Sequence, residues 1–256
     1  MPNAINGTDA SVNKLPRGKT VVSASPKKAS ASPQSTRGRP RDPNLVQKRK
    51  EQILSTTTHY FARLGYQDTD LQVIADELGI GKGTIYRYFP TKESLFRAAL
   101  DRGLASLRDL IDQKIPPGSD PLAGFANAIE AYLRFFREQP ELVELFLIER
   151  AVFPGRCKPA YFIQREQDSG RWNEVFRHLA SRGRVRPGNS EGILNAIGDL
   201  LYGTMFANHL AGRDIPPGDQ ARDILDLVFH GILGPDARDE FPGARNETRR
   251  KTVKKR

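Results

Sequence analysis

Residues 53–92 alternate helical runs of apolar residues with single glycines, and this pattern constrains the fold more than any other feature of the chain. A first run ends at Gly65, as expected at the C-terminus of a helix. Asp70 stands where its carboxylate can cap a second helix, which ends at Gly79. A third short helix starts near Lys82 after a tight turn. We therefore predict three short helices, the last two joined as a helix-turn-helix.

The third predicted helix gathers polar side chains that are suited to DNA. Ile85 and Phe89 are expected to anchor it against the second helix, in which Val73, Ile74 and Leu78 would form the buried stripe. Basic, hydroxyl and aromatic side chains on one helix suit phosphate and base-edge contacts in a major groove. The alternative, an ordinary amphipathic helix with solvated charges, is made less favourable by the adjoining turn and helix. The exposed polar positions are Lys82, Thr84, Tyr86, Arg87 and Tyr88.

Residues 46–100 resemble the DNA-binding domain of TetR/AcrR-type transcriptional regulators. The match includes Gly65-Tyr66 and the long run Gly79-Ile80-x-Lys82-Gly83-Thr84-Ile85-Tyr86-x-Tyr88-Phe89. The resemblance implies that Tyr86 and Lys92 bind phosphates. It assigns base reading to Lys82, Gly83, Thr84, Arg87 and Tyr88 on the recognition helix, and a further base contact to Gln72.

Two positions depart from that family. Asp70 stands where Thr or Ser is common, and Gly81 replaces a common Ser. Both changes remove a hydroxyl group, and a carboxylate at position 70 repels a close phosphate. The resemblance therefore does not extend to the phosphate contact that is usual at this end of the second helix.

Positive charge is concentrated at the two ends of the chain. The first 50 residues contain eleven Lys and Arg against two Asp, and residues 236–256 contain eight against four acidic residues. Since the whole chain carries a formal charge of +10, residues 51–235 carry −3. Basic ends either strengthen non-specific binding to DNA by neutralising phosphates or act as solvated tails. The composition favours neither.

Residues 1–43 and 235–256 are predicted to be disordered basic tails, because they offer few large apolar residues to order them. The segment Arg37-Gly38-Arg39-Pro40-Arg41 resembles the core of an AT-hook, whose arginines lie in a narrow minor groove. Arg37 and Arg39 are therefore candidate minor-groove contacts, and the alternative is a basic turn in a linker. The first tail has no apolar run typical of a signal peptide.

The remaining residues predict an all-α protein of about nine helices. Prolines and glycines mark the ends of long helical runs, and no run alternates long enough to require a strand. We expect a helix-turn-helix domain over residues 44–100 and a helical effector-binding and dimerisation domain over residues 101–234.

The last two predicted helices, residues 190–211 and 219–233, carry apolar side chains on more than one face. Such a helix must be buried on several faces, either in a monomer core or between subunits. The resemblance implies that both helices pair with their symmetry mates in a homodimer. Two recognition helices would then reach successive major grooves of a palindromic operator in double-stranded DNA.

Aromatic residues of the second domain are candidates for a small-molecule pocket, although residues at these spacings more commonly belong to a core. Pockets for small ligands are mainly apolar with a few polar groups. We therefore expect an apolar or amphipathic effector of unknown identity. The candidate lining residues are Phe125, Tyr132, Phe146, Phe162, Trp172 and Phe176.

Other classes of protein find no support in the sequence. The four histidines are scattered, the single Cys157 has no partner for a disulfide or a zinc site, and no phosphate-binding or dinucleotide-binding glycine loop is present. We therefore expect no enzyme activity, no cofactor, no metal and no membrane contact. A single thiol fits the reducing cytoplasm, which is the expected location.

The leading hypothesis is a ligand-responsive dimeric regulator, a repressor that a small molecule releases from its operator by shifting its conformational population. One alternative is an architectural DNA binder that uses its basic tails. The other is an all-α small-molecule-binding protein with a vestigial helix-turn-helix.

Overall fold

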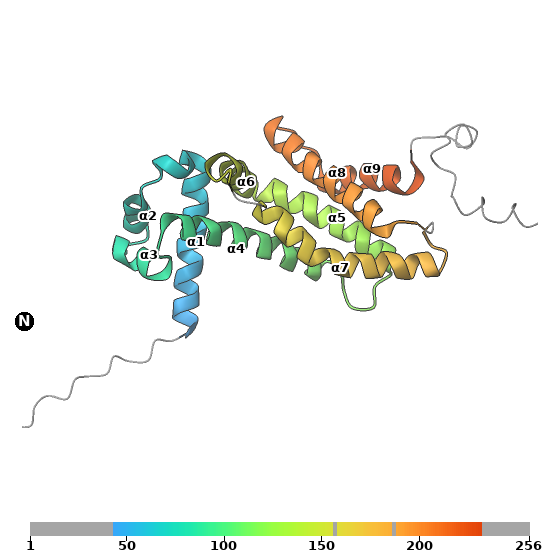
Figure 1. Ribbon diagram of the computed structural model, residues 1–256, viewed down its shortest axis with the longest axis horizontal. Coiled ribbons are helices and arrows are strands. Elements are labelled where there is room, and N and C mark those ends of the chain that lie inside the picture. Colours follow the sequence, from blue (N-terminus) through green and yellow to red (C-terminus); the bar gives the residue numbers. More distant parts are fainter. Residues whose placement is uncertain (1–42, 156–157, 186–187, 232–256) are drawn as a thin grey trace, which may run out of the picture. The chain divides into compact units, whose positions relative to one another are not determined.

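The computed structural model describes residues 43–155, 158–185 and 188–231, which form nine helices and no strand (Figure 1). The all-α prediction is therefore confirmed for this part of the chain. The predicted tails, apart from Pro43, and the last residues of the helix expected at 219–233 lie outside the described residues. The helices are α1 (Pro43–Asp68), α2 (Leu71–Glu77), α3 (Lys82–Tyr88), α4 (Lys92–Gln113), α5 (Pro121–Glu138), α6 (Pro140–Val152), α7 (Ala160–Ser181), α8 (Ser190–Leu210) and α9 (Pro217–His230).

Polar side chains cap the starts of α2, α4 and α5. The Asp70 carboxylate accepts a hydrogen bond from a backbone N–H in the first turn of α2, and Asp120 does the same for α5. Thr91 and Ser94 form a reciprocal capping box at the start of α4. Each cap satisfies N–H groups that the first turn of a helix leaves without an intrahelical partner.

α1 is kinked near its end. Gly65 adopts φ 82° and ψ 170°, a conformation that strains residues with a Cβ atom. The hydroxyl group of Thr69 donates to the carbonyl oxygens of Gly65 (2.7 Å) and Tyr60 (3.2 Å), which ties down the residues after the kink. The helix end predicted at Gly65 is therefore a kink, and helical turns resume as far as Asp68.

α2 buries a different stripe from the predicted one. Val73 is 46% exposed, whereas Leu71 is 3% exposed and Ile74 is fully buried. The helix begins at Leu71 and has only two turns, so residues 71, 74 and 75 share the face that meets the core. Val73 lies outside that face, and the prediction that it packs inward was wrong.

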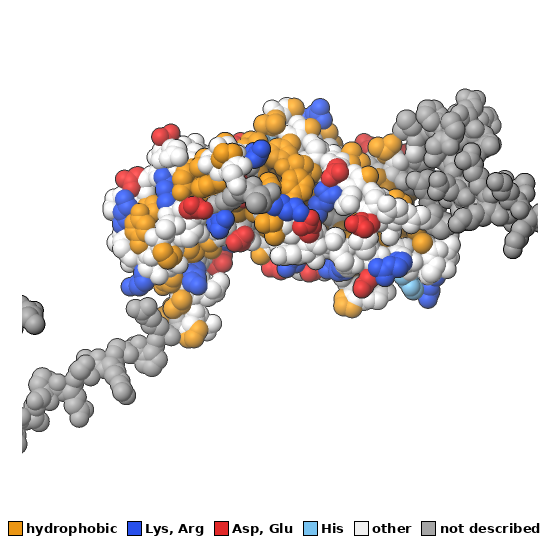
Figure 2. Space-filling view, viewed as in Figure 1, with side chains coloured by type: hydrophobic (Ala, Val, Ile, Leu, Met, Phe, Trp, Pro, Cys, Tyr) orange, Lys and Arg blue, Asp and Glu red, His pale blue; other side chains and the backbone are white. Residues whose placement is uncertain are grey.

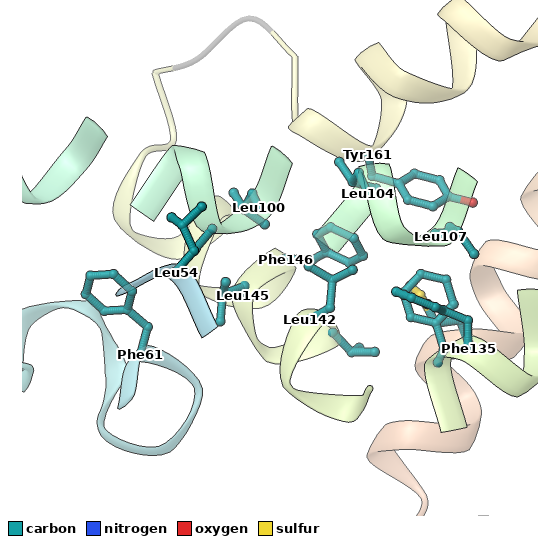
Figure 3. Packing of buried hydrophobic residues seen from close by; sticks show 14 of the residues in the cluster. Leu54, Phe61, Leu100, Leu104, Leu107, Phe135, Leu142, Leu145, Phe146 and Tyr161 are labelled. Carbon is teal, nitrogen blue, oxygen red and sulfur yellow. The ribbon is translucent and has the colours of Figure 1, made fainter. Parts of the chain in front are cut away.

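One apolar core includes residues from all nine helices of the described chain. α4 packs against α1, α5, α6 and α7, and α5 packs against α8 and α9. Figure 3 shows Leu54 of α1, Leu100 of α4 and Leu145 of α6 lying together. The predicted domain boundary at residue 100 falls inside α4, which buries Leu100 and Leu104 on either side of it. α4 therefore connects the first three helices to the other helices of the chain.

Within the described ranges, the apolar side chains are distributed over the faces of the helices that pack together. None of the helices in these ranges is long and apolar enough to cross a membrane.

Candidate nucleic-acid interface and cavity

The turn between α2 and α3 closes one helix and begins the next. The N–H of Ile80 donates to the carbonyl oxygen of Ala75 (2.9 Å), and the N–H of Gly79 donates to that of Asp76 (3.1 Å). Gly79 has φ 61°, so these are the hydrogen bonds that end a helix at a left-handed glycine. The turn thereby fixes the direction in which α3 leaves α2.

Two apolar anchors fix the rotation of α3 about its own axis. Ile85 is fully buried and Phe89 is 8% exposed, as predicted for both. Since positions four apart share one face of a helix, the polar side chains of α3 lie on the other faces. Gly83, Tyr86 and Arg87 are exposed, and Lys82, Thr84 and Tyr88 are half-buried.

The surface around α2 and α3 mixes charged, polar and apolar groups. Figure 2 shows Lys and Arg side chains distributed over this end of the visible face, interspersed with apolar side chains and a few acids. Arg87 lies over the ring of Tyr88, 5.5 Å from its centroid. Gln72 donates from its side-chain amide to Asp76 (2.7 Å) on the exposed side of α2. Each of these side chains is in reach of a molecule that approaches this surface.

Lys82 is paired with Asp70, a contact that was not predicted from the sequence. Its Nζ atom lies 2.8 Å from Oδ1 of Asp70. The backbone N–H of Gln72 and then the Lys82 ammonium lower the pKa of the Asp70 carboxyl, and the carboxylate in turn raises the pKa of Lys82. Asp70 stands where the family commonly has Thr or Ser. A carboxylate in place of a hydroxyl group was the signal in the sequence that could have pointed to a nearby cation.

Lys92 links the start of α4 to the end of α1. Its Nζ atom donates to the carbonyl oxygen of Gln67 (3.0 Å) and lies 5.0 Å from the centroid of the Tyr66 ring. Partial burial lowers the pKa of this ammonium. Lys92 therefore holds the segment that follows the kink in α1, in addition to the phosphate role predicted for it.

A basic segment on α1 adds to this region. Lys48, Arg49 and Lys50 lie in the first turns of α1, with Lys48 exposed and the other two half-buried. Their charge had been counted with that of the first 50 residues, although the predicted tail ends at residue 43. Arg37 and Arg39 lie outside the described residues.

A cavity of about 170 Å³ lies between α4, α5, α7 and α8. Of the six aromatic residues expected to line a pocket, Phe125, Tyr132 and Trp172 line this cavity. Its other walls are mainly apolar and include Leu104 and Leu107 of α4.

The three remaining aromatic candidates pack beside the cavity and do not line it. Phe176 lies 5.0 Å from Phe125, measured between ring centroids. Phe146 and Phe162 both pack against the ring of Tyr161, which does line the cavity. Figure 3 shows Phe146 and Tyr161 close to each other. Tyr161 was absent from the predicted lining. It lies in the first turn of α7, directly after Pro159 and Ala160, and the spacing of apolar residues there does not indicate which side of the helix faces a cavity.

Metal ligation has no geometric basis in the parts of the chain that are described. No group of three or more His, Cys, Asp or Glu side chains there is arranged to hold a metal ion. The fold and the exposed polar surface of α3 define this protein as one of the helix-turn-helix class.

Comparison with known proteins narrows that class. Residues 53–99 match the family model described as bacterial regulatory proteins, tetR family. The uncharacterized HTH-type transcriptional regulator YerO of Bacillus subtilis (strain 168) is 27% identical over 203 residues, 76% of this chain and 61% of that protein. The HTH-type transcriptional repressor KstR of Rhodococcus jostii (strain RHA1) is 31% identical over 103 residues, 40% of this chain and 47% of that protein. The chain thus spans about half to three fifths of the length of these relatives.

Solved structures agree on the fold. The transcriptional regulator FadR from Bacillus subtilis, crystallised with stearoyl-CoA, superposes with a TM-score of 0.60 at 17% identity, over 72% of this chain and 99% of that one. Residues 53–99 therefore contain a tetR-family domain, which confirms the resemblance drawn from the motif.

Proposed function

We propose that this protein is a dimeric transcriptional repressor that binds operator DNA through α2 and α3 and is released by a small molecule bound in the cavity. The observation that carries the proposal is the rotation of α3. With Ile85 and Phe89 buried, its polar side chains face outward together, as a helix in a major groove requires. KstR, a relative in sequence, is named a repressor, which supports repression rather than activation.

Each polar side chain then takes a role that its position allows. Tyr86, on the exposed side of α3, and Lys92, at the start of α4, would hold phosphates and set the register of the helix on the duplex. Arg87 and Thr84 would meet base edges, with Gln72 of α2 beside them. Lys82, Gly83 and Tyr88 complete the surface, while Arg37 and Arg39 would follow the adjacent minor groove.

α4 offers a physical connection between the cavity and DNA. It begins at Lys92 and carries Leu104, Leu107 and Ile111, which line the cavity more than two turns further along. A ligand that displaces this wall therefore pushes on the same rigid helix that positions Lys92. A conformation in which the spacing of the two recognition helices is wrong would become more populated.

The dimer would form through α8 and α9. Leu210 is 68% exposed, Leu227 is 44% exposed and Phe229 is 41% exposed in the single chain. Exposed apolar side chains on α8 and α9 are better removed from water, and a second copy of the same helices would bury them symmetrically. Such a dimer would present two α3 helices roughly 34–36 Å apart, which matches successive major grooves.

Selection of bound sequences from genomic fragments at near-physiological salt tests the proposal. We expect an enriched palindrome whose half-sites are one or more helical turns apart. Recovery of fragments without a common motif would instead support an architectural role that depends on backbone contacts and the basic tails.

Two substitutions on α3 then separate base reading from phosphate binding. Arg87→Ala should cost roughly 1–3 kcal/mol on the selected site and much less on random DNA, because it removes base-edge hydrogen bonds. Tyr86→Phe should weaken both by a similar factor, since phosphate contacts carry no sequence information. Arg177→Ala, an exposed arginine on α7, serves as the control. An equal loss on both DNAs for Arg87→Ala would reassign that residue to the backbone.

A further inference from the structure

The polar groups of the cavity are few, and its charges are already neutralised. Arg165 donates to Oδ1 of Asp199 (2.7 Å) and to the carbonyl oxygen of Asn195 (2.7 Å). Asp168 lies 3.2 Å from Nε of Arg108 and accepts from Gln164 (2.9 Å). An ionic group brought into this space would therefore lack a free counter-ion, and an unpaired charge in apolar surroundings is costly. The cavity favours an uncharged ligand.

Two tyrosine hydroxyl groups add to this polarity, beside Asn195 and beside Ser169, whose hydroxyl group donates to the carbonyl oxygen of Glu166 (2.7 Å). The hydroxyl oxygens of Tyr132 and Tyr161 lie 3.0 Å apart, and both residues line the cavity. Tyr132 is 6% exposed and Tyr161 is 7% exposed. Burial raises the pKa of both phenols, for Tyr161 to about 12, so both keep their protons at neutral pH and act as neutral donors.

In this pair of hydroxyl groups, one O–H donor has no strong acceptor. Two phenols carry two O–H groups, and only one of them is used when one hydroxyl donates to the other. The further contact of the pair is from Tyr132 to the Sδ atom of Met205 at 3.7 Å, and a thioether is a weak acceptor. A strong donor in a buried position therefore lacks a strong acceptor, and such a group lowers its free energy when an oxygen atom reaches it.

The size of the space limits what can carry that oxygen. The cavity measures about 170 Å³, and an apolar cavity of about 150 Å³ is enough to hold a benzene ring. Ring-sized molecules therefore fit between Phe125, Trp172 and the leucines of α4.

We propose that the cavity binds an uncharged, ring-sized apolar molecule that presents one oxygen acceptor, such as a ketone, to the Tyr132–Tyr161 pair. This inference rests on the proposed function, in which the same cavity is the effector site. It adds the chemical class of the ligand and the two residues that recognise it.

A matched set of probes tests the class of ligand. Cyclohexanone has the ring and the acceptor, cyclohexane has the ring alone, and cyclohexanecarboxylate adds a charge. Trp172 is the only tryptophan of the chain and lines the cavity, so its fluorescence measures binding at this place. We expect saturable binding of cyclohexanone and cyclohexane to the full-length protein, and at least about tenfold weaker binding of the carboxylate.

The double variant Tyr132→Phe/Tyr161→Phe tests the pair itself. We expect it to weaken cyclohexanone binding about tenfold, because the bound carbonyl loses its donor, and to leave the cyclohexane dissociation constant unchanged within about twofold. Tyr202→Phe is the matched control. Its ring lies 4.7 Å from that of Tyr161 (between centroids), but Tyr202 does not line the cavity. Both probes should therefore bind this variant as they bind the original chain.

Three outcomes would overturn the proposal. An equal loss of both probes in the double variant would show that the phenols only support the walls. Tightest binding of the carboxylate would show that the cavity takes anions. Absence of cyclohexane and cyclohexanone binding to the unaltered protein would remove the cavity as a ligand site. Sequence-selective DNA binding, measured on the same preparations, is independent of these results, so its loss alone would count against the proposed function.

Discussion

Lys82 shows at the scale of single residues why a predicted contact changes in the folded chain. Its side chain was expected to approach DNA, whereas Asp70 was expected to cap α2 and repel phosphates. The turn at Gly79 brings the two within 2.8 Å. The Asp70 carboxylate therefore caps α2 and also holds Lys82, so under the proposed function it would compete with DNA for that ammonium.

Asp70→Asn separates these two roles of the carboxylate. Asparagine still caps a helix, but it no longer pairs with the ammonium of Lys82. We expect tighter binding to all DNA and a salt dependence that is steeper by about one phosphate contact, because a released cation neutralises one more phosphate. Fluorescence anisotropy titrations at several salt concentrations give the slope. Glu138→Gln, at an exposed acid on α5, controls for the change in net charge, and an equal slope in both variants would contradict the prediction.

Tyr161 makes stability depend on alkaline pH. Burial raises its pKa from 10.0 to about 12. As the pH rises above 10, the unfolded chain loses this proton before the folded chain does, so the stabilisation is fully present below pH 10 and is lost as the pH approaches 12. In Tyr161→Phe the free energy of unfolding should therefore fall less steeply over that interval. Urea denaturation of both proteins in steps from pH 8 upward measures it, and parallel curves would count against the burial argument.

The crossing of α4 and α6 depends on a residue without a side chain. A Cβ atom at Gly103 would lie 2.6 Å from Cδ1 of Leu142, which is 2% exposed and enclosed by the core. The helical pattern in the sequence indicated both helices. It did not indicate that Gly103 lies against Leu142, because that contact depends on the packing of two segments nearly forty residues apart.

Gly103→Ala should therefore be destabilising although alanine favours helices. Overpacking a core costs roughly 1–3 kcal/mol and the better helix propensity offsets about 1 kcal/mol, so we expect a net loss of about 1 kcal/mol. Gly170→Ala is the matched control, since Gly170 is exposed in α7 with no atom within 4 Å of its added Cβ. That variant should gain about 1 kcal/mol. Chemical denaturation measures the free energy of unfolding of both variants. Two variants of equal stability would show that α6 shifts freely to accommodate the added methyl group.

The whole molecule is expected to act on DNA as a pair of chains. Leu227→Arg places a charge in the exposed apolar surface of α9 and should yield monomers in sedimentation experiments at micromolar concentration. Binding to a site with two half-sites should weaken by about a hundredfold, because the second recognition helix is no longer held nearby. Ile163→Arg, at a position on α7 with 45% exposure, should change neither property. A Leu227→Arg protein that remains dimeric would place the interface elsewhere.

The number of helices and most of their ends were predictable from local chemistry. Asp120 followed by proline, and the capping box at Thr91, act within one turn of chain. The exposed position of Val73 was missed because a helix of two turns leaves its rotation to the elements that it contacts. Half of the aromatic residues proposed for the pocket line the cavity, since spacing along one helix does not distinguish a cavity wall from a core.

By itself the sequence determined the all-α class, the helix-turn-helix and the outward set of side chains on α3, because caps, glycines and helical periodicity are local properties. Only the tertiary structure decided that Lys82 pairs with Asp70, that Lys92 holds the end of α1, and that Tyr132 and Tyr161 meet in one cavity. Those contacts join residues from different helices. Their geometry follows from how the apolar faces pack, which no single segment of the chain contains.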